Sequence, residues 1–176
     1  LRGGPRHATG GLPGAIAVPD ALALPRDGWN GKRVAVIDEA GSWATLSAAE
    51  TLADQGAAVD IVAAPGTPLW SVTLYSRMTA LERLAKAGVR LRNSLAPLRS
   101  EDGILTCRST GSGEDMRLGP YDMLVHSDPG AAPSALHAAL EARGVAVRAI
   151  GDAAAPRTLF EAMHDAHAAI LEMDAI

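Results

Sequence analysis

The residues whose types and spacing could do chemistry gather near the carboxyl end of the chain. Gly151 and Asp152 directly follow the apolar run Val145–Ile150, which predicts a strand, and Pro156 with Arg157 then opens a run at helical spacing. An acidic side chain between a strand and a helix is where open α/β sheets bind nucleotide cofactors. The pattern therefore indicates a nucleotide-binding turn.

Two roles are open for Asp152. Its carboxylate could accept a hydrogen bond from a flavin's ribityl or ribose hydroxyl, while the amides of the following helix face the phosphate. Alternatively, Asp152 caps that helix, which we expect to run from Pro156 to Met173, and Arg157 is solvated. The spacing is equally compatible with both.

A second candidate turn follows the apolar run Arg33–Ile37. A dinucleotide fold requires Gly-x-Gly-x-x-Gly here, so that the backbone can approach the pyrophosphate. Only Gly41 remains, Asp38 and Glu39 place two carboxylates in the turn, and Trp43 replaces a small residue. We keep Gly41 as a cofactor-binding candidate but favour a nucleotide fold retained as a scaffold.

Other chemical centres are not indicated. His164 and His167 lie three residues apart on one expected helix, but no third metal ligand accompanies them. Cys107 has no neighbouring histidine and is expected to be an inert buried thiol, and Ser134 with His137 forms no Gly-x-Ser-x-Gly elbow. We predict no catalytic residue and no metal ligand in this chain.

The elements that must position these groups alternate between strand and helix, which predicts a parallel sheet with covered faces. The expected strands are Arg33–Ile37, Val59–Ala63 and Met123–His126, the expected helices are Trp43–Gln55, Thr73–Ala87 and Pro133–Arg143, and short flap strands are expected at Val89–Leu98, Ile104–Ser109 and Met116–Leu118. The fold class is α/β, a three-layer Rossmann-like domain with a parallel central sheet and a small antiparallel β flap.

Three parts are expected along the chain. Residues 1–31, rich in proline and glycine, predict an extended connector from a preceding domain, with a short helix at Asp20–Leu24. Residues 32–144 form a degenerate dinucleotide-binding domain. Residues 145–176 are the strand and helix that return to the preceding domain.

Composition limits the partners. The net charge of −4 and the dispersed basic residues argue against nucleic acid and against an anionic membrane surface. No apolar run reaches the roughly 20 residues that span a bilayer. The single cysteine fits a reducing compartment, so we expect a soluble, cytoplasmic protein.

Five segments, taken in order, resemble one family. They are Ala8-Thr9-Gly10, Pro19–Leu22, Gly31–Gly41, Ala49–Gly56 and Gly151–Arg157. Together they resemble the C-terminal region of the trimethylamine dehydrogenase and 2,4-dienoyl-CoA reductase (NADH:flavin oxidoreductase) family. The resemblance implies that Thr9, Gly10, Gly151, Asp152, Pro156 and Arg157 belong to the cofactor-binding region.

Family proteins join an N-terminal flavin mononucleotide (FMN) barrel with an iron-sulfur cluster to two nucleotide-binding domains. The resemblance implies that FMN, the cluster and flavin adenine dinucleotide (FAD) or ADP belong to the parent protein, and that this chain alone holds no cofactor. In the dehydrogenase branch the second domain has lost its dinucleotide role. Asp38, Glu39 and the missing glycines place this chain nearer that branch.

The resemblance therefore implies an accessory domain of a flavin-dependent oxidoreductase that acts on amines or enoyl substrates. By itself the chain is expected to be inactive, with the missing barrel and first nucleotide-binding domain as its partners and a tendency to form a homo-oligomer. The alternative is a stand-alone nucleotide-binding or structural Rossmann-like module without enzymatic activity. Leu1 in place of methionine, followed by a glycine-rich arm, favours the first interpretation.

Overall fold

The computed structural model describes residues 12–128, 130, 132 and 135–173. The chain divides into two compact units, with the boundary between Asp128 and Pro129. Each unit is described by itself.

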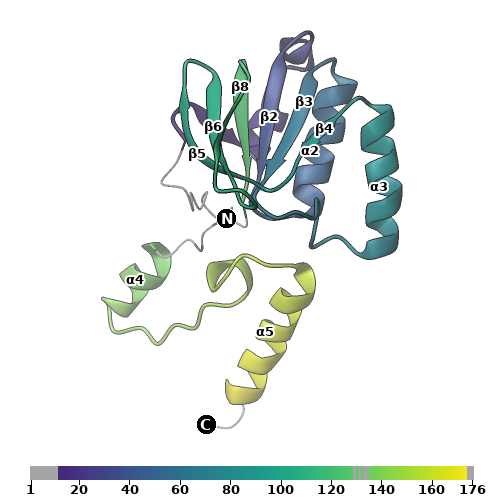
Figure 1. The fold of residues 1–176 in the computed structure, drawn as a ribbon. Coiled ribbons are helices and arrows are strands. Elements are labelled where there is room, and N and C mark those ends of the chain that lie inside the picture. The colour runs from purple at the N-terminus through teal and green to yellow at the C-terminus, as the bar shows by residue number, and fades with distance from the viewer. Residues whose placement is uncertain (1–11, 129, 131, 133–134, 174–176) are drawn as a thin grey trace. The chain divides into compact units, whose positions relative to one another are not determined.

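The larger unit is built on a five-stranded parallel sheet (Figure 1). In spatial order its strands are β1 (Ala15–Ala17), β8 (Met123–Ser127), β2 (Arg33–Asp38), β3 (Ala58–Ala63) and β4 (Arg90–Arg92). The three central strands are runs of β-branched and aliphatic residues, as strands covered on both faces require. Val36 of β2 lies between Ile61 and Val125 in the register.

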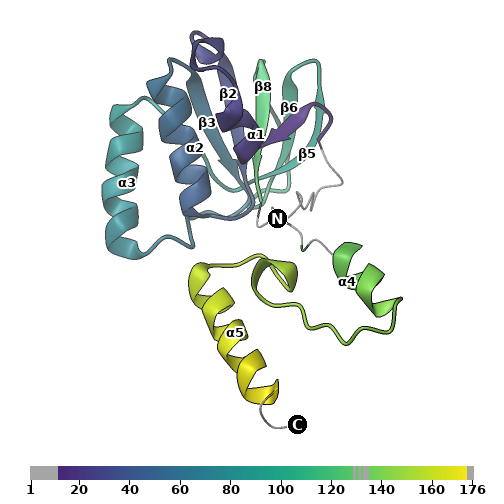
Figure 2. The same ribbon diagram turned by 180° about the vertical axis from the view of Figure 1, so that it is seen from behind.

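Helices cover one face of this sheet (Figure 2). They are α1 (Val18–Ala23), the 3-10 helix η1 (Arg26–Trp29), α2 (Trp43–Asp54) and α3 (Leu74–Lys86). Alternate strand residues, such as Val34 and Ile61, pack here against Leu46 and Leu52 of α2 and Leu84 of α3. This packing fixes the end of β2 against the start of α2, where the candidate turn lies.

A three-stranded antiparallel sheet covers the other face. Its strands are β5 (Leu95–Glu101), β6 (Ile104–Ser109) and β7 (Asp115–Leu118). Ile37 and Val62 of the large sheet pack against Leu105 and Cys107 of this flap. The predicted fold class, a three-layer Rossmann-like α/β domain with an antiparallel flap, is confirmed.

Two local differences from the sequence prediction lie in this unit. The expected connector contains an edge strand, β1, that pairs with β8 before α1 begins at Val18, with Pro19 in its first turn. The expected strand Val89–Leu98 is two strands, because Ser94 takes a φ of 57° and turns the chain from the large sheet into the flap. Neither a three-residue strand nor a turn without glycine gives a strong sequence signal.

The smaller unit contains α4 (Ala135–Glu141), the 3-10 helix η2 (Gly151–Ala153) and α5 (Leu159–Met173). The predicted strand Val145–Ile150 is wrong for this structure, because these residues are irregular. A strand needs a partner for its backbone groups, and the described residues provide none for 145–150. Helix α5 begins at Leu159 rather than at Pro156.

Candidate functional site

The turn after β2 is organised around a buried carboxylate. Asp38, at the end of β2, is 2% exposed, and its Oδ1 accepts hydrogen bonds from the Gly41 backbone N–H at 2.7 Å and the Thr45 hydroxyl at 2.6 Å. Burial raises the pKa of Asp38, and the hydrogen bonds from Thr45 and Gly41 oppose this effect in part. The amide that a phosphate would use is therefore bound to the chain's own carboxylate.

A chain of hydroxyl groups continues from this carboxylate into the next strand. The Thr45 Oγ1 lies 2.7 Å from the Ser127 Oγ at the end of β8. Because the single hydroxyl hydrogen of Thr45 goes to Asp38, Ser127 is the donor to Thr45. Two strand ends and the first turns of α2 are thus joined by hydrogen bonds.

The loop between β3 and α3 closes the same turn from outside. Gly41 has a φ of +59°, and a Cβ placed on it would lie 2.2 Å from Cδ2 of Trp70. Ser71 donates to the Gly41 carbonyl oxygen through its backbone N–H at 2.9 Å and its hydroxyl at 2.7 Å. The Trp70 ring therefore lies directly against the backbone that a pyrophosphate would approach.

Sequence reasoning found Asp38 and Gly41 but missed Trp70, which lies 29 positions after Gly41 in an irregular loop. The only available signal was a large aromatic residue among turn-forming residues. Trp43, which stands where a dinucleotide fold has a small residue, is the first residue of α2 and is 53% exposed.

The structure brings two of the C-terminal candidates, Gly151 and Arg157, together through Asp165, a residue that the sequence did not single out. Asp165 of α5 binds the Arg157 Nη2 at 2.5 Å through its Oδ2, and the same oxygen accepts from the Gly151 backbone N–H at 3.3 Å. Asp152 is exposed in η2, and Pro156 is partly buried in the segment before α5. Arg157 is therefore paired with a carboxylate, and its side chain stays 44% exposed to solvent.

The cap of α5 is formed by other residues. The Glu161 carboxylate accepts from the backbone N–H of Thr158 at 3.0 Å and also from the Thr158 hydroxyl. The bond from the Thr158 N–H to the Glu161 carboxylate is one half of a capping box, and it satisfies the amide of the residue before Leu159. The capping role that we considered for Asp152 is taken by Thr158 and Glu161, whereas its cofactor role stays a prediction. Thr9 and Gly10 lie outside the described residues.

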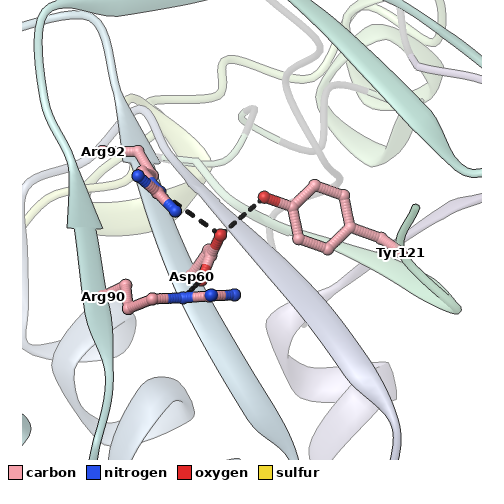
Figure 3. Close-up of polar contacts among 4 residues, drawn as sticks. All are labelled: Asp60, Arg90, Arg92 and Tyr121. Carbon is pink, nitrogen blue, oxygen red and sulfur yellow. Dashed lines mark hydrogen bonds and ion pairs between the residues drawn. The ribbon is translucent and has the colours of Figure 1, made fainter. Parts of the chain in front are cut away.

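A second polar cluster lies between β3, β4 and the segment before β8 (Figure 3). Asp60 of β3 is 1% exposed, and its Oδ2 accepts from the Tyr121 hydroxyl at 2.7 Å. Arg90 donates through Nε to Oδ1 at 2.5 Å, and Arg92 donates through Nε to Oδ2 at 3.4 Å. Burial and the hydrogen bond to Asp60 raise the pKa of Tyr121, so its phenol stays a donor at neutral pH.

Three further observations concern the thiol, metal ligands and membrane-spanning helices. Cys107 is fully buried in β6, and burial raises the pKa of its thiol to about 11. Among the described residues, no three histidine, cysteine, aspartate or glutamate side chains are placed to hold a metal ion. Within the same described part, no helix is long and apolar enough to cross a membrane.

Comparison with known proteins identifies the fold. No protein-family model and no curated protein matches the chain. Histamine dehydrogenase from Rhizobium sp. 4-9 matches 98% of this chain with 30% of its own, at a TM-score of 0.86 and 23% identity. The 6-hydroxypseudooxynicotine amine oxidase HisD from Pseudomonas geniculata N1 matches 88% of this chain with 24% of its own, at a TM-score of 0.75 and 21% identity.

A 2-naphthoyl-CoA reductase also matches 94% of this chain with 24% of its own, at a TM-score of 0.74 and 23% identity. This chain therefore spans less than a third of the length of each of these three proteins. At such identities the similarity shows a shared fold. That fold occurs as one part of a dehydrogenase, an oxidase and a reductase, all of which are much longer chains.

Proposed function

We propose that this chain is an accessory, nucleotide-binding-like domain of a flavin-dependent oxidoreductase similar to trimethylamine dehydrogenase. The chemistry, on amines or enoyl substrates, would take place in other domains of a longer cytoplasmic protein. One observation carries the proposal: nearly the whole chain matches 30% of an amine-oxidising dehydrogenase at a TM-score of 0.86.

The closed turn supports an accessory role rather than dinucleotide binding. Asp38 already uses the Gly41 amide, and Trp70 lies against the Gly41 backbone. Glu39 adds a further acidic residue beside this turn. A diphosphate would have to displace an aromatic ring and approach like charges, so the donor set does not fit a nicotinamide dinucleotide.

The smaller unit supports the existence of a further domain. Helix α5 exposes five large apolar side chains: Leu159, Phe160, Met163, Ile170 and Leu171. An apolar cavity of about 380 Å³ in the same unit is lined by Leu136, Leu140, Val147 and Ile150. Apolar surface of this extent marks a contact with another protein surface. We propose that the preceding nucleotide-binding domain covers it and pairs with residues 145–150.

The residues of this chain exclude one of the expected cofactors, the iron-sulfur cluster, and leave a candidate contact for another, FAD or ADP. An iron-sulfur cluster does not fit, because one cysteine cannot ligate it, so the cluster and FMN would belong to the barrel. For FAD or ADP of the preceding domain, Asp165 already accepts from the Gly151 backbone N–H and from one terminal nitrogen, Nη2, of Arg157. Among the described residues, the exposed carboxylate of Asp152 accepts no hydrogen bond, so we propose that it accepts one from a ribose hydroxyl.

The test is to compare the chain alone with the longer polypeptide encoded by its reading frame. We expect coding sequence for a barrel and a first nucleotide-binding domain upstream, and a flavin absorption band in the longer protein only. The chain alone should be colourless after desalting and inactive with nicotinamide donors. A start codon next to Leu1, or a flavin band that survives desalting of the chain alone, would refute the proposal.

A further inference from the structure

We propose that Arg90 and Arg92, held in place by Asp60, form a binding site for a small oxyanion, with a phosphate group as the preferred ligand. The site lies on the flap side of the sheet, at strand β4, and is separate from the turn at Gly41. The proposal does not depend on the proposed function of the chain.

The strand geometry places the two guanidinium groups together. Arg90 and Arg92 are two residues apart on β4, so their side chains leave the same face of the strand. Each uses its Nε to bind a different oxygen of the Asp60 carboxylate, and Figure 3 shows the two guanidinium groups converging on it. One buried carboxylate thus orients two arginines.

The outer nitrogens of both arginines remain available. A guanidinium carries five N–H donors, of which the Nε–H is one. Within the described part of the chain, the terminal amino groups of Arg90 and Arg92 form no hydrogen bond or ion pair. The side chains are 48% and 39% exposed, so these donors can reach a ligand from solvent.

The local charge is positive although the chain as a whole carries −4. The single negative charge of Asp60 is paired with two positive charges, those of Arg90 and Arg92. A third cation, Arg33, lies on the same side of the sheet, with its guanidinium carbon 5.7 Å from the centroid of the Tyr121 ring. Lys32 and Asp122 nearby form their own pair at 3.8 Å. The surplus positive charge is what an oxyanion would neutralise.

The acidic residues of the adjoining flap turn do not remove this surplus. Glu101 and Asp102 are exposed, and among the residues described neither forms an ion pair with Arg90 or Arg92. Their charges lie on the turn that contacts the Tyr121 backbone through Gly103. The two arginines are therefore left facing solvent without a second carboxylate.

The arrangement favours phosphate over a single carboxylate. Two planar guanidinium groups can each donate to different oxygens of one phosphate, which offers more acceptors and more charge than a carboxylate. Because Asp60 restrains both side chains before binding, less conformational entropy is lost when a ligand arrives. Free phosphate and a phosphorylated small molecule share this chemistry.

The experiment is a titration of the 176-residue chain with inorganic phosphate by calorimetry and by nuclear magnetic resonance of the arginine Nε–H signals. Ionic strength is held at about 0.1 M with chloride, where exposed charges more than about 10 Å apart are screened. Glycerol phosphate and acetate are titrated in parallel. The Nε–H signals of Arg90 and Arg92 should shift and saturate with both phosphates, and more weakly with acetate.

Two variants provide the comparison. Arg92→Gln keeps the shorter Arg90–Asp60 contact, so the fold should persist while phosphate affinity falls by about fivefold or more. Arg83→Gln is the matched control, because Arg83 is 49% exposed and pairs with Glu50 on the helical face. It should leave phosphate binding unchanged, and thermal unfolding checks that both variants are folded.

Several outcomes would overturn the proposal. They are no saturable shift of either signal in the wild-type chain, an equal loss of affinity in Arg83→Gln, or unchanged affinity in a folded Arg92→Gln. If Arg92→Gln does not fold, Arg92→Lys keeps the charge and loses the planar guanidinium group, and unchanged phosphate affinity in it would overturn the role assigned to the Arg92 guanidinium. Acetate binding as tight as phosphate would refute the preference for phosphate.

Discussion

Tyr121→Phe isolates the hydroxyl that binds the buried carboxylate of Asp60. The substitution keeps the ring, which is 6% exposed, and removes only the donor that lies 2.7 Å from Asp60 Oδ2. That oxygen then retains the Arg92 Nε at 3.4 Å, a longer and weaker contact. A hydrogen bond to a charged group contributes about 1.5–3 kcal/mol, so we expect the free energy of unfolding to fall by roughly 2 kcal/mol.

The measurement is chemical and thermal unfolding of Tyr121→Phe beside Tyr75→Phe. Tyr75 is 85% exposed and serves as the matched control, for which the change should stay within about 0.5 kcal/mol. For a domain of this size, roughly 2 kcal/mol corresponds to a lowering of the melting temperature by about 8 °C. Equal stabilities of the two variants would refute the assignment of Tyr121 as a structural donor to Asp60.

The same contact predicts how stability depends on alkaline pH. The pKa of Tyr121 is raised in the folded chain by burial and by Asp60, so the folded state holds the phenolic proton more tightly than the unfolded state does. The stability that the protonated Tyr121 phenol contributes is fully present below the tyrosine pKa of the unfolded chain, near 10, and is lost as the pH rises above that pKa. Tyr121→Phe should therefore show a shallower loss of stability above about pH 10. Identical slopes for the two chains would contradict this sign.

Three further predictions concern the thiol, the turn and helix α5. Cys107, whose pKa burial raises to about 11, should react with a thiol reagent only as fast as the chain unfolds, and rapid reaction of the folded chain would refute its burial. Asp38→Asn removes a buried charge at the turn and keeps an acceptor for Gly41. Calorimetry should still detect no NADH binding because Trp70 remains, and micromolar affinity would refute the closed turn. The apolar face of α5 should cause self-association in ultracentrifugation, which Phe160→Glu should reduce, and a wild-type monomer at high concentration would contradict this.

The sequence predicted the elements whose stability is mainly local or apolar. The central strands were predictable because each is an apolar run long enough to be buried on both faces, and α2 and α3 end where Gly56 and Gly88 follow. The same reasoning failed at residues 145–150, where an equally apolar run has no strand to pair with among the described residues. An apolar run thus predicts burial, but a strand also depends on a partner.

The polar sites were harder to predict because they depend on register. Asp60 meets Arg90 only because β3 and β4 align these two residues side by side, 30 positions apart in the sequence. An acidic residue within the buried run Val59–Ala63 was a usable signal, since a buried charge requires partners. The contact of Trp70 with Gly41 had no comparable signal, because an irregular loop has no period that reveals its neighbours.

Asp38 and Asp60 show two solutions to the burial of a carboxylate. Asp60 is paired with cations that reach solvent, so the cluster keeps donors free for a further anion. Asp38 is instead held by an amide and a hydroxyl at the start of α2, the position where a dinucleotide fold binds phosphate. The chain supplies its own acidic group at that helix terminus and covers the turn with Trp70. The turn at Gly41 therefore keeps the geometry of the fold but no longer offers its amide to a ligand. The donors that are open to an anion, those of Arg90 and Arg92, lie instead on the opposite face of the sheet, at β4.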